Sequence, residues 1–126
     1  MKQKPLNVLI IDDEVLIQKI FKLALQSRGH LVKGALDGVE ALKIWKKFNP
    51  DLVFLDVLMP RKDGFGVLRE KPKKSKAKIV MMSAHDDLDD QKIKETKVDL
   101  FVKKPFEDIY LLVQQGENLV QKKLKQ

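Results

Sequence analysis

The segment V-L-I-I-D-D-E at residues 8–14 decides the fold of this chain. Its four apolar residues, Val8–Ile11, run without interruption and end at two aspartates. An apolar run of this length is typical of a strand buried on both faces, as in a parallel sheet. Two later runs have the same form, and each also ends at a polar residue: Leu52–Leu55 before Asp56, and Ile79–Met82 before Ser83.

Weaker apolar runs and helical stretches lie around these three predicted strands. Leu31–Val32 and Leu100–Val102 predict two further strands. Between the runs, apolar residues recur at steps of three and four, which is the period of a helix with one face on a core. Strand and helix alternate five times, and this order predicts a doubly wound α/β sandwich with a parallel sheet. The helical stretches and their stop signals are Ile17–Leu25 before Gly29, Ala41–Phe48 before Asn49-Pro50, and Ile109–Val120.

The composition excludes several classes of protein. The chain has 126 residues, which fits one domain spanning 1–126. It has no cysteine and only two histidines, which excludes disulfide scaffolds, thiolate nucleophiles and cysteine-type zinc or iron–sulfur sites. The apolar runs are too short for a transmembrane helix or a signal peptide, so we expect a soluble, cytoplasmic protein. The net charge of +7 admits a nucleic acid, an anionic membrane or an acidic protein as partner and does not choose among them.

The polar groups at the strand ends belong to one predicted site, because ligands of an open α/β sheet bind outside the carboxyl ends of its strands. Three carboxylates would converge there, and like charges at short range raise one another's pKa. A hard divalent cation relieves that repulsion, and a set of oxygen ligands favours Mg²⁺ or Mn²⁺ over zinc. The predicted site consists of Asp12, Asp13, Asp56, Ser83 and Lys104.

An ammonium and a hydroxyl beside these carboxylates suit the transfer of a phosphoryl group. Together with a metal ion, Lys104 and Ser83 can stabilise the equatorial oxygens of the transferring group. A carboxylate that is not a ligand alone can act as the nucleophile and form an acyl phosphate. Structural alternatives remain open for these residues taken singly. Asp12 and Asp13 could cap the following helix, Ser83 could be a helix cap, and Lys104 could be a plain surface lysine.

Five motifs occur in order, each at the end of a predicted strand or just beyond it: VLIIDDE at 8–14, LVFLDVLMP at 52–60, DG at 63–64, MMSA at 81–84 and FVKKPF at 101–106. Together they resemble the receiver domain of two-component response regulators, a group that includes the stand-alone chemotaxis regulator. The resemblance covers nearly the whole chain, from about Val8 to the last helix. It implies a flavodoxin-like α/β fold, with a five-stranded parallel sheet in the order 2-1-3-4-5 and five helices.

The resemblance also implies a role for each site residue. Asp56 would be the phosphoryl acceptor, and Lys104 would contact the phosphoryl group. Ser83 would be the switch hydroxyl, and Phe101 the aromatic ring that turns inward when the hydroxyl moves. Many members have tyrosine in place of Phe101 and small residues at Lys97-Val98, so these departures concern the output surface. The implied ligands of Mg²⁺, with Mn²⁺ as an alternative, are Asp13 and Asp56 directly, Asp12 through water, and the backbone carbonyl of Leu58.

As a whole, the resemblance implies a single-domain signalling protein that takes its phosphoryl group from phosphohistidine on a histidine kinase or a phosphotransfer protein. We expect it to catalyse only its own phosphorylation and dephosphorylation. Output would come from binding a downstream protein, or from passing the phosphoryl group on in a relay. We expect a monomer, with neither a membrane nor a nucleic acid as partner. An acidic protein partner is favoured by the lysines of the fourth helix, the fifth strand and the segment between them: Lys92, Lys94, Lys97 and Lys103.

Two other functions share part of this pattern. A phosphatase of the haloacid-dehalogenase type also has a nucleophilic aspartate after an apolar strand, but it needs a second aspartate two residues later, where this chain has Leu58. A degenerate receiver that only binds partners would lack part of the acceptor set, which is complete here. His85 follows Ser83 by two residues and is expected at the solvent-facing rim, with an influence on dephosphorylation as the alternative. The five lysines of 71–78 are expected to form a solvated loop rather than a nucleic-acid site.

Overall fold

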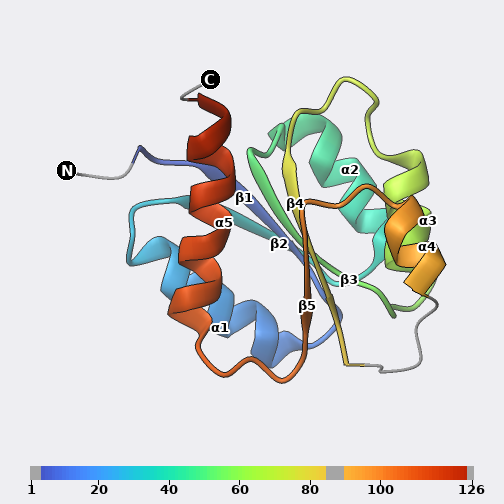
Figure 1. Ribbon diagram of the computed structural model, residues 1–126, viewed down its shortest axis with the longest axis horizontal. Coiled ribbons are helices and arrows are strands. Elements are labelled where there is room, and N and C mark those ends of the chain that lie inside the picture. The colour runs from blue at the N-terminus through green and yellow to red at the C-terminus, as the bar shows by residue number, and fades with distance from the viewer. Residues whose placement is uncertain (1–3, 85–89, 125–126) are drawn as a thin grey trace.

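The computed structural model describes residues 4–84 and 90–124, which form a five-stranded parallel sheet (Figure 1). The strand order is β2-β1-β3-β4-β5, which confirms the predicted doubly wound, flavodoxin-like arrangement. His85, and with it the predicted position at the rim, lies outside the described residues. The strands are β1 (Asn7–Ile11), β2 (Leu31–Ala35), β3 (Leu52–Asp56), β4 (Lys78–Ser83) and β5 (Leu100–Lys103).

Helices cover both faces of the sheet, as Figure 1 shows, and each face has its own apolar core. α1 and α5 pack on one face, where the ring centroids of Phe21 and Phe54 lie 4.7 Å apart. α2, α3 and α4 lie on the other face, where Trp45 is buried in the core as its helical position predicts. In the described part of the chain, none of these helices combines the length and the hydropathy needed to span a membrane. The helices are α1 (Val15–Gln26), α2 (Gly38–Phe48), α3 (Gly64–Glu70), α4 (Asp90–Glu95) and α5 (Ile109–Leu124).

The position of a strand in the sheet explains how clearly the sequence predicts it. All five residues of the central strand β3 are buried, so its apolar run is continuous. β2 and β5 lie at the two edges of the sheet, and most of their residues are exposed or half-buried. β2 therefore continues through Lys33 and Gly34 to Ala35, further than the Leu31–Val32 run predicts. β4 begins at Lys78, so the lysine-rich loop ends one residue earlier than expected.

The turn after β3 depends on the Asp63-Gly64 pair. A Cβ at Gly64 would lie 2.5 Å from the backbone oxygen of Asp56, so this close approach requires a glycine. The Asp63 side chain accepts a hydrogen bond of 2.9 Å from the backbone N–H of Gly66 and so caps α3. These two contacts hold the start of α3 against the end of β3, and they position the turn that carries Leu58.

Candidate functional site

The carboxyl edge of the sheet brings together the three aspartates that the sequence predicts. Asp12 follows β1, Asp13 is the next residue, and Asp56 is the last residue of β3. One carboxylate oxygen from each lies within 4.8 Å of the others. Asp12 is fully buried and Asp56 is 6% exposed, whereas Asp13 is exposed. The parallel pairing of β1 with β3 explains the convergence, because both strands end at the same edge.

Lys104 provides the counter-charge of this acidic cluster. It follows β5, and only 9% of its side chain is exposed. Its Nζ donates a hydrogen bond of 2.7 Å to Asp12 Oδ2 and lies 3.5 Å from Asp56 Oδ1. It also donates at 3.2 Å to Glu14 Oε1. The alternative of a plain surface lysine is therefore wrong. Glu14 was not predicted as part of the site, although it is the third acidic residue of the DDE segment.

The electrostatics of the cluster favour a bound cation. The pKa of Asp56 is raised from 3.8 to about 7, first by burial and then by the Asp12 carboxylate. Burial also raises the pKa of Asp12, although the hydrogen bond from Lys104 opposes it. Burial lowers the pKa of Lys104, but its contacts with Asp12 and Asp56 outweigh burial and raise it overall. One ammonium thus faces several crowded carboxylates, and this set of oxygen ligands fits Mg²⁺.

The structure also tests the alternative that Asp12 or Asp13 caps helix α1. Asp12 Oδ1 accepts a hydrogen bond of 2.9 Å from the backbone N–H of Glu14, which stabilises the turn after β1. Glu14 occupies the N-cap position of α1, and its side chain makes no capping hydrogen bond. Neither Asp12 nor Asp13 is the N-cap of α1, and both carboxylates belong to the acidic cluster.

The predicted switch residues lie on adjacent strands. Ser83 is the last residue of β4 and is 1% exposed. Phe101 lies on β5, where it pairs with Met81, and its half-buried ring packs against the core beneath α2 and α3. Leu58 lies two residues beyond β3, and its side chain is 48% exposed. The carboxyl edge thus gathers the predicted catalytic and metal-binding residues, while their individual roles stay predictions.

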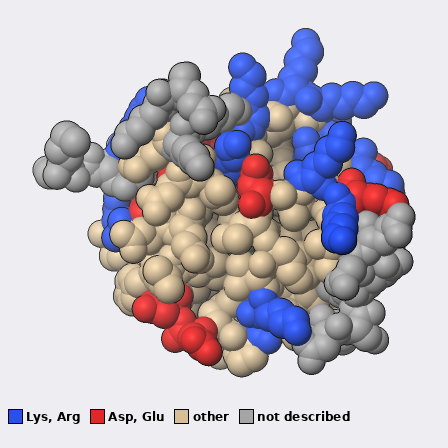
Figure 2. All heavy atoms as spheres, viewed as in Figure 1, with Lys and Arg blue, Asp and Glu red and all other residues tan. Residues whose placement is uncertain are grey.

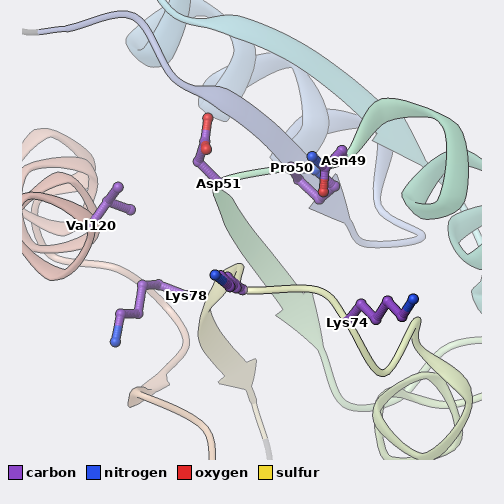
Figure 3. Close-up of a pocket in the computed structure, with 7 residues that line it drawn as sticks. Asn49, Pro50, Asp51, Lys74, Lys78 and Val120 are labelled. Atoms are coloured by element: carbon purple, nitrogen blue, oxygen red, sulfur yellow. The ribbon is translucent and has the colours of Figure 1, made fainter. Parts of the chain in front are cut away.

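A cavity of about 430 Å³ lies at the amino-terminal ends of β3 and β4, where Lys74, Lys76 and Lys78 line it together with Asp51 (Figure 3). In Figure 3 the side chains of Lys74 and Lys78 point in different directions. Lys78 Nζ also lies 3.6 Å from a carboxylate oxygen of Asp99. This cavity therefore does not concentrate positive charge on one point.

Comparisons with known proteins identify one family for this chain. The sequence model described as "Response regulator receiver domain" matches residues 8–114. A relative from Porphyridium aerugineum, named "Probable transcriptional regulator ycf27", is 42% identical over 101 residues, which are 79% of this chain and 42% of the relative. A relative of the same name from Guillardia theta is 43% identical over 101 residues, 79% of this chain and 40% of the relative. The chain therefore spans less than half the length of these relatives.

Solved structures show the same fold. The chemotaxis response regulator CheY4 of Vibrio cholerae is 28% identical, with a TM-score of 0.79 over 90% of this chain and 99% of that one. A CheY-like receiver domain protein from Methanospirillum hungatei has a TM-score of 0.87 over 97% of this chain and 98% of that one. At its 20% identity, this second likeness shows the fold alone.

The sheet, the acidic cluster and the lysine at its carboxyl edge define a domain of phosphorylation-based signalling. The chain belongs to the response regulator receiver domain family, whose sequence model covers most of its length. Receiver domains act in two-component signal transduction and bind Mg²⁺ in an acidic pocket. This chain has an acidic cluster of Asp12, Asp13 and Asp56 at the carboxyl edge of its sheet.

Proposed function

We propose that this chain accepts a phosphoryl group on Asp56 from a phosphohistidine of a histidine kinase or a phosphotransfer protein, in a Mg²⁺-dependent reaction in the cytoplasm. The observation that carries the proposal is the surroundings of Asp56, a buried carboxylate 3.5 Å from the Lys104 ammonium and close to two further carboxylates. An Asp56 oxygen attacks phosphorus, the P–N bond to the imidazole breaks, and its electron pair stays on the ring nitrogen.

The side chains around Asp56 divide the remaining tasks. Asp12, Asp13 and Asp56 would hold Mg²⁺, with Mn²⁺ as an alternative, and the backbone carbonyl of Leu58 would be a further ligand. The ion supplies positive charge to the oxygens of the transferring phosphoryl group. Lys104 supplies a second positive charge there and holds Asp12 through a charge-assisted hydrogen bond.

A groove beside the acceptor site gives a donor protein a place to dock. Its volume is about 620 Å³, and it runs between α1 and the segment that joins β5 to α5. Ile17 and Ile20 line it on one side, Pro105 and Phe106 on the other, and Lys104 at the end nearest the acidic cluster. A donor seated there would bring its phosphohistidine to Asp56. The groove is continuous with an exposed apolar stripe on α1: Leu16, Ile20 and Leu23.

The experiment that tests the function is phosphorylation of Asp56 by phosphohistidine proteins from the same cell, compared with Asp13→Ala. We expect Asp13→Ala to lose Mg²⁺ binding and to lower the phosphorylation rate by at least about 100-fold. Asp13 is the exposed carboxylate of the cluster and is therefore the one most accessible to the ion. Radioactive label on Asp56 and Mg²⁺ titration are the two measurements. Asp51→Ala is the control, because Asp51 lies at the amino-terminal end of β3, away from the acidic cluster. Full phosphorylation of the parent chain in Mg²⁺-free buffer would contradict the assignment.

We further propose that phosphorylation changes the binding of a downstream protein at the surface of α4, β5 and α5, or that the phosphoryl group passes on in a relay, and that the chain turns over no other substrate. Lys94, Lys97 and Lys103 are exposed on this surface, and α5 adds exposed Tyr110 and Leu111. Lys92 lies on α4, with its side chain outside the described part. In Figure 2, uncharged surface fills the middle of the face that contains β5 and α5. An acidic partner with apolar side chains between its charges fits this combination.

The switch from Ser83 to Phe101 predicts a change in ring position. A phosphoryl group on Asp56 offers an acceptor to the Ser83 hydroxyl, and movement of the hydroxyl opens space next to β4. Phe101 has no ring hydroxyl to keep in water, so it should occupy that space readily and be partly inward even without phosphate. The measurement is aromatic NMR of Phe101 with and without beryllofluoride, a phosphoryl mimic. Ser83→Ala is the control and should abolish the shift. An identical ring position in both states of the parent would rule out this route.

A further inference from the structure

Gln18 is a buried polar residue of α1 to which the acceptor chemistry assigns no role. Its side chain is 6% exposed. Its Nε2 lies 3.0 Å from the carbonyl oxygen of Ile10, 3.0 Å from that of Asp12 and 2.9 Å from that of Ala35. Three acceptors thus share the two hydrogens of one amide. A single side chain ties the carboxyl end of β1 to that of β2.

The oxygen atom of the Gln18 amide shows that this arrangement carries a cost in stability. Gln18 Oε1 is buried without a hydrogen-bond partner in the described part of the chain, which is destabilising. The reversed amide would point this oxygen at three carbonyl oxygens, so only the donor orientation is acceptable. A Cβ at Gly34 would lie 2.1 Å from Gln18 Oε1, so Gly34 provides the space that the amide occupies.

The main chain and the side chain of Asp12 are held by different residues. Lys104 and the backbone N–H of Glu14 bind its two carboxylate oxygens, whereas Gln18 binds its carbonyl oxygen. That carbonyl belongs to the planar peptide group that joins Asp12 to Asp13. The orientation of this peptide sets the direction of the main chain at Asp13, just beyond the end of β1. Asp13 is exposed, so its backbone direction decides whether its carboxylate faces the cluster.

We infer that Gln18 is a positioning residue, which fixes the Asp12–Asp13 peptide, directs the Asp13 carboxylate toward Asp56 and thereby sets the affinity of the cluster for Mg²⁺. The inference rests on the proposed function only in taking Mg²⁺ as the ion bound. Removal of a group that hydrogen-bonds to a metal ligand and orients it typically lowers metal affinity 10- to 100-fold.

The test is a Mg²⁺ titration of the full chain without a phosphodonor, followed by backbone amide NMR shifts. Gln18→Met keeps the side-chain length and removes the donor, and we expect a roughly tenfold higher Mg²⁺ concentration at half-saturation. Saturating Mg²⁺ should restore the phosphorylation rate with a small phosphodonor. Glu117→Gln perturbs the buried network near the amino-terminal ends of β1 and β2 and is the matched control. A loss of stability alone should leave the half-saturating Mg²⁺ concentration unchanged. An unchanged half-saturation in folded Gln18→Met overturns the inference.

Gly34→Ala, on β2, perturbs the same Gln18 amide and is the alternative test variant if Gln18→Met does not fold. The added methyl group should displace the amide and raise the half-saturating Mg²⁺ concentration several-fold. In a Gln18→Ala background, where no amide remains, Gly34→Ala should have no further effect. Equal effects in both backgrounds, or none in the parent, would overturn the inference. A parent chain that binds Mg²⁺ but accepts no phosphoryl group would contradict the proposed function alone, and one that binds no Mg²⁺ would contradict both.

Discussion

Asp56→Asn should abolish phosphoryl incorporation and, in Mg²⁺-free buffer at about pH 8, raise the unfolding temperature by at least about 5 °C. The amide keeps the shape of the carboxylate and removes one of the crowded negative charges. The pKa of Asp56 is raised to about 7 in the folded chain, so the folded state binds this proton more tightly than the unfolded state. Ionisation of Asp56 therefore lowers stability progressively from about pH 4 to pH 7. The full penalty above pH 7 is at most about 4 kcal/mol, because a tenfold change in proton affinity corresponds to roughly 1.4 kcal/mol.

The pH dependence separates this effect from an ordinary stabilising substitution. The difference between Asp56→Asn and the parent should be largest above pH 7 and should shrink toward zero near pH 4, where Asp56 is protonated when folded. Added Mg²⁺ should stabilise the parent and narrow the difference. Thermal unfolding followed by circular dichroism measures both trends. Glu107→Gln, which neutralises an exposed carboxylate, is the control and should show neither. A less stable Asp56→Asn at pH 8 would mean that Asp56 has a structural role.

Glu117→Leu should lower the free energy of unfolding by about 3 kcal/mol near pH 7. Glu117 lies on α5 and is 1% exposed. Its carboxylate accepts hydrogen bonds from Arg28 Nη2 at 2.6 Å and Nε at 2.7 Å, and it lies 2.6 Å from His30 Nε2. The backbone N–H of Leu6 donates to His30 Nδ1 at 3.0 Å, so the ring proton is assigned to Nε2, which donates to Glu117. Removal of the carboxylate would leave the His30 donor buried and unpaired.

The pH profile of this loss has the opposite sign to that of Asp56. Burial raises the pKa of Glu117, but the hydrogen bonds from Arg28 and His30 outweigh burial and lower it overall. Ionised Glu117 therefore contributes stability above the unfolded pKa near 4.5, and the contribution disappears as the pH falls through the lower folded pKa. The deficit of Glu117→Leu should thus shrink below about pH 4. Urea unfolding measures it, with Gln114→Leu on the exposed face of α5 as control. A deficit at pH 7 equal to that of the control would show that the buried network contributes nothing.

Much of the candidate site could be predicted from the sequence because its signals are local. A continuous apolar run, such as Leu52–Leu55, reports burial on both faces of the sheet, and the polar residue that ends it reports the strand end. Parallel pairing then places all such ends at one edge. These local signals place Asp12, Asp56 and Lys104 at one edge without reference to any distance between them. They are weakest for β2 and β5, because these edge strands are mostly exposed or half-buried and their apolar runs are short.

Only the tertiary structure decided which distant residues hold the site and the helices in place. Glu117 lies 87 residues from His30. Its spacing from Val113 and Val120 is consistent with the buried face of α5, but nothing in the sequence identifies its partners. A Cβ at Gly116 would lie 2.9 Å from Leu52 Cδ2 and 3.0 Å from Phe54 Cζ, so the glycine lets α5 approach β3 closely. Gln18 is polar within an amphipathic helix and gives no signal that it binds three carbonyl groups. The period of a sequence determines which face of an element is buried, but the partner of a buried polar group depends on how helices pack across the sheet.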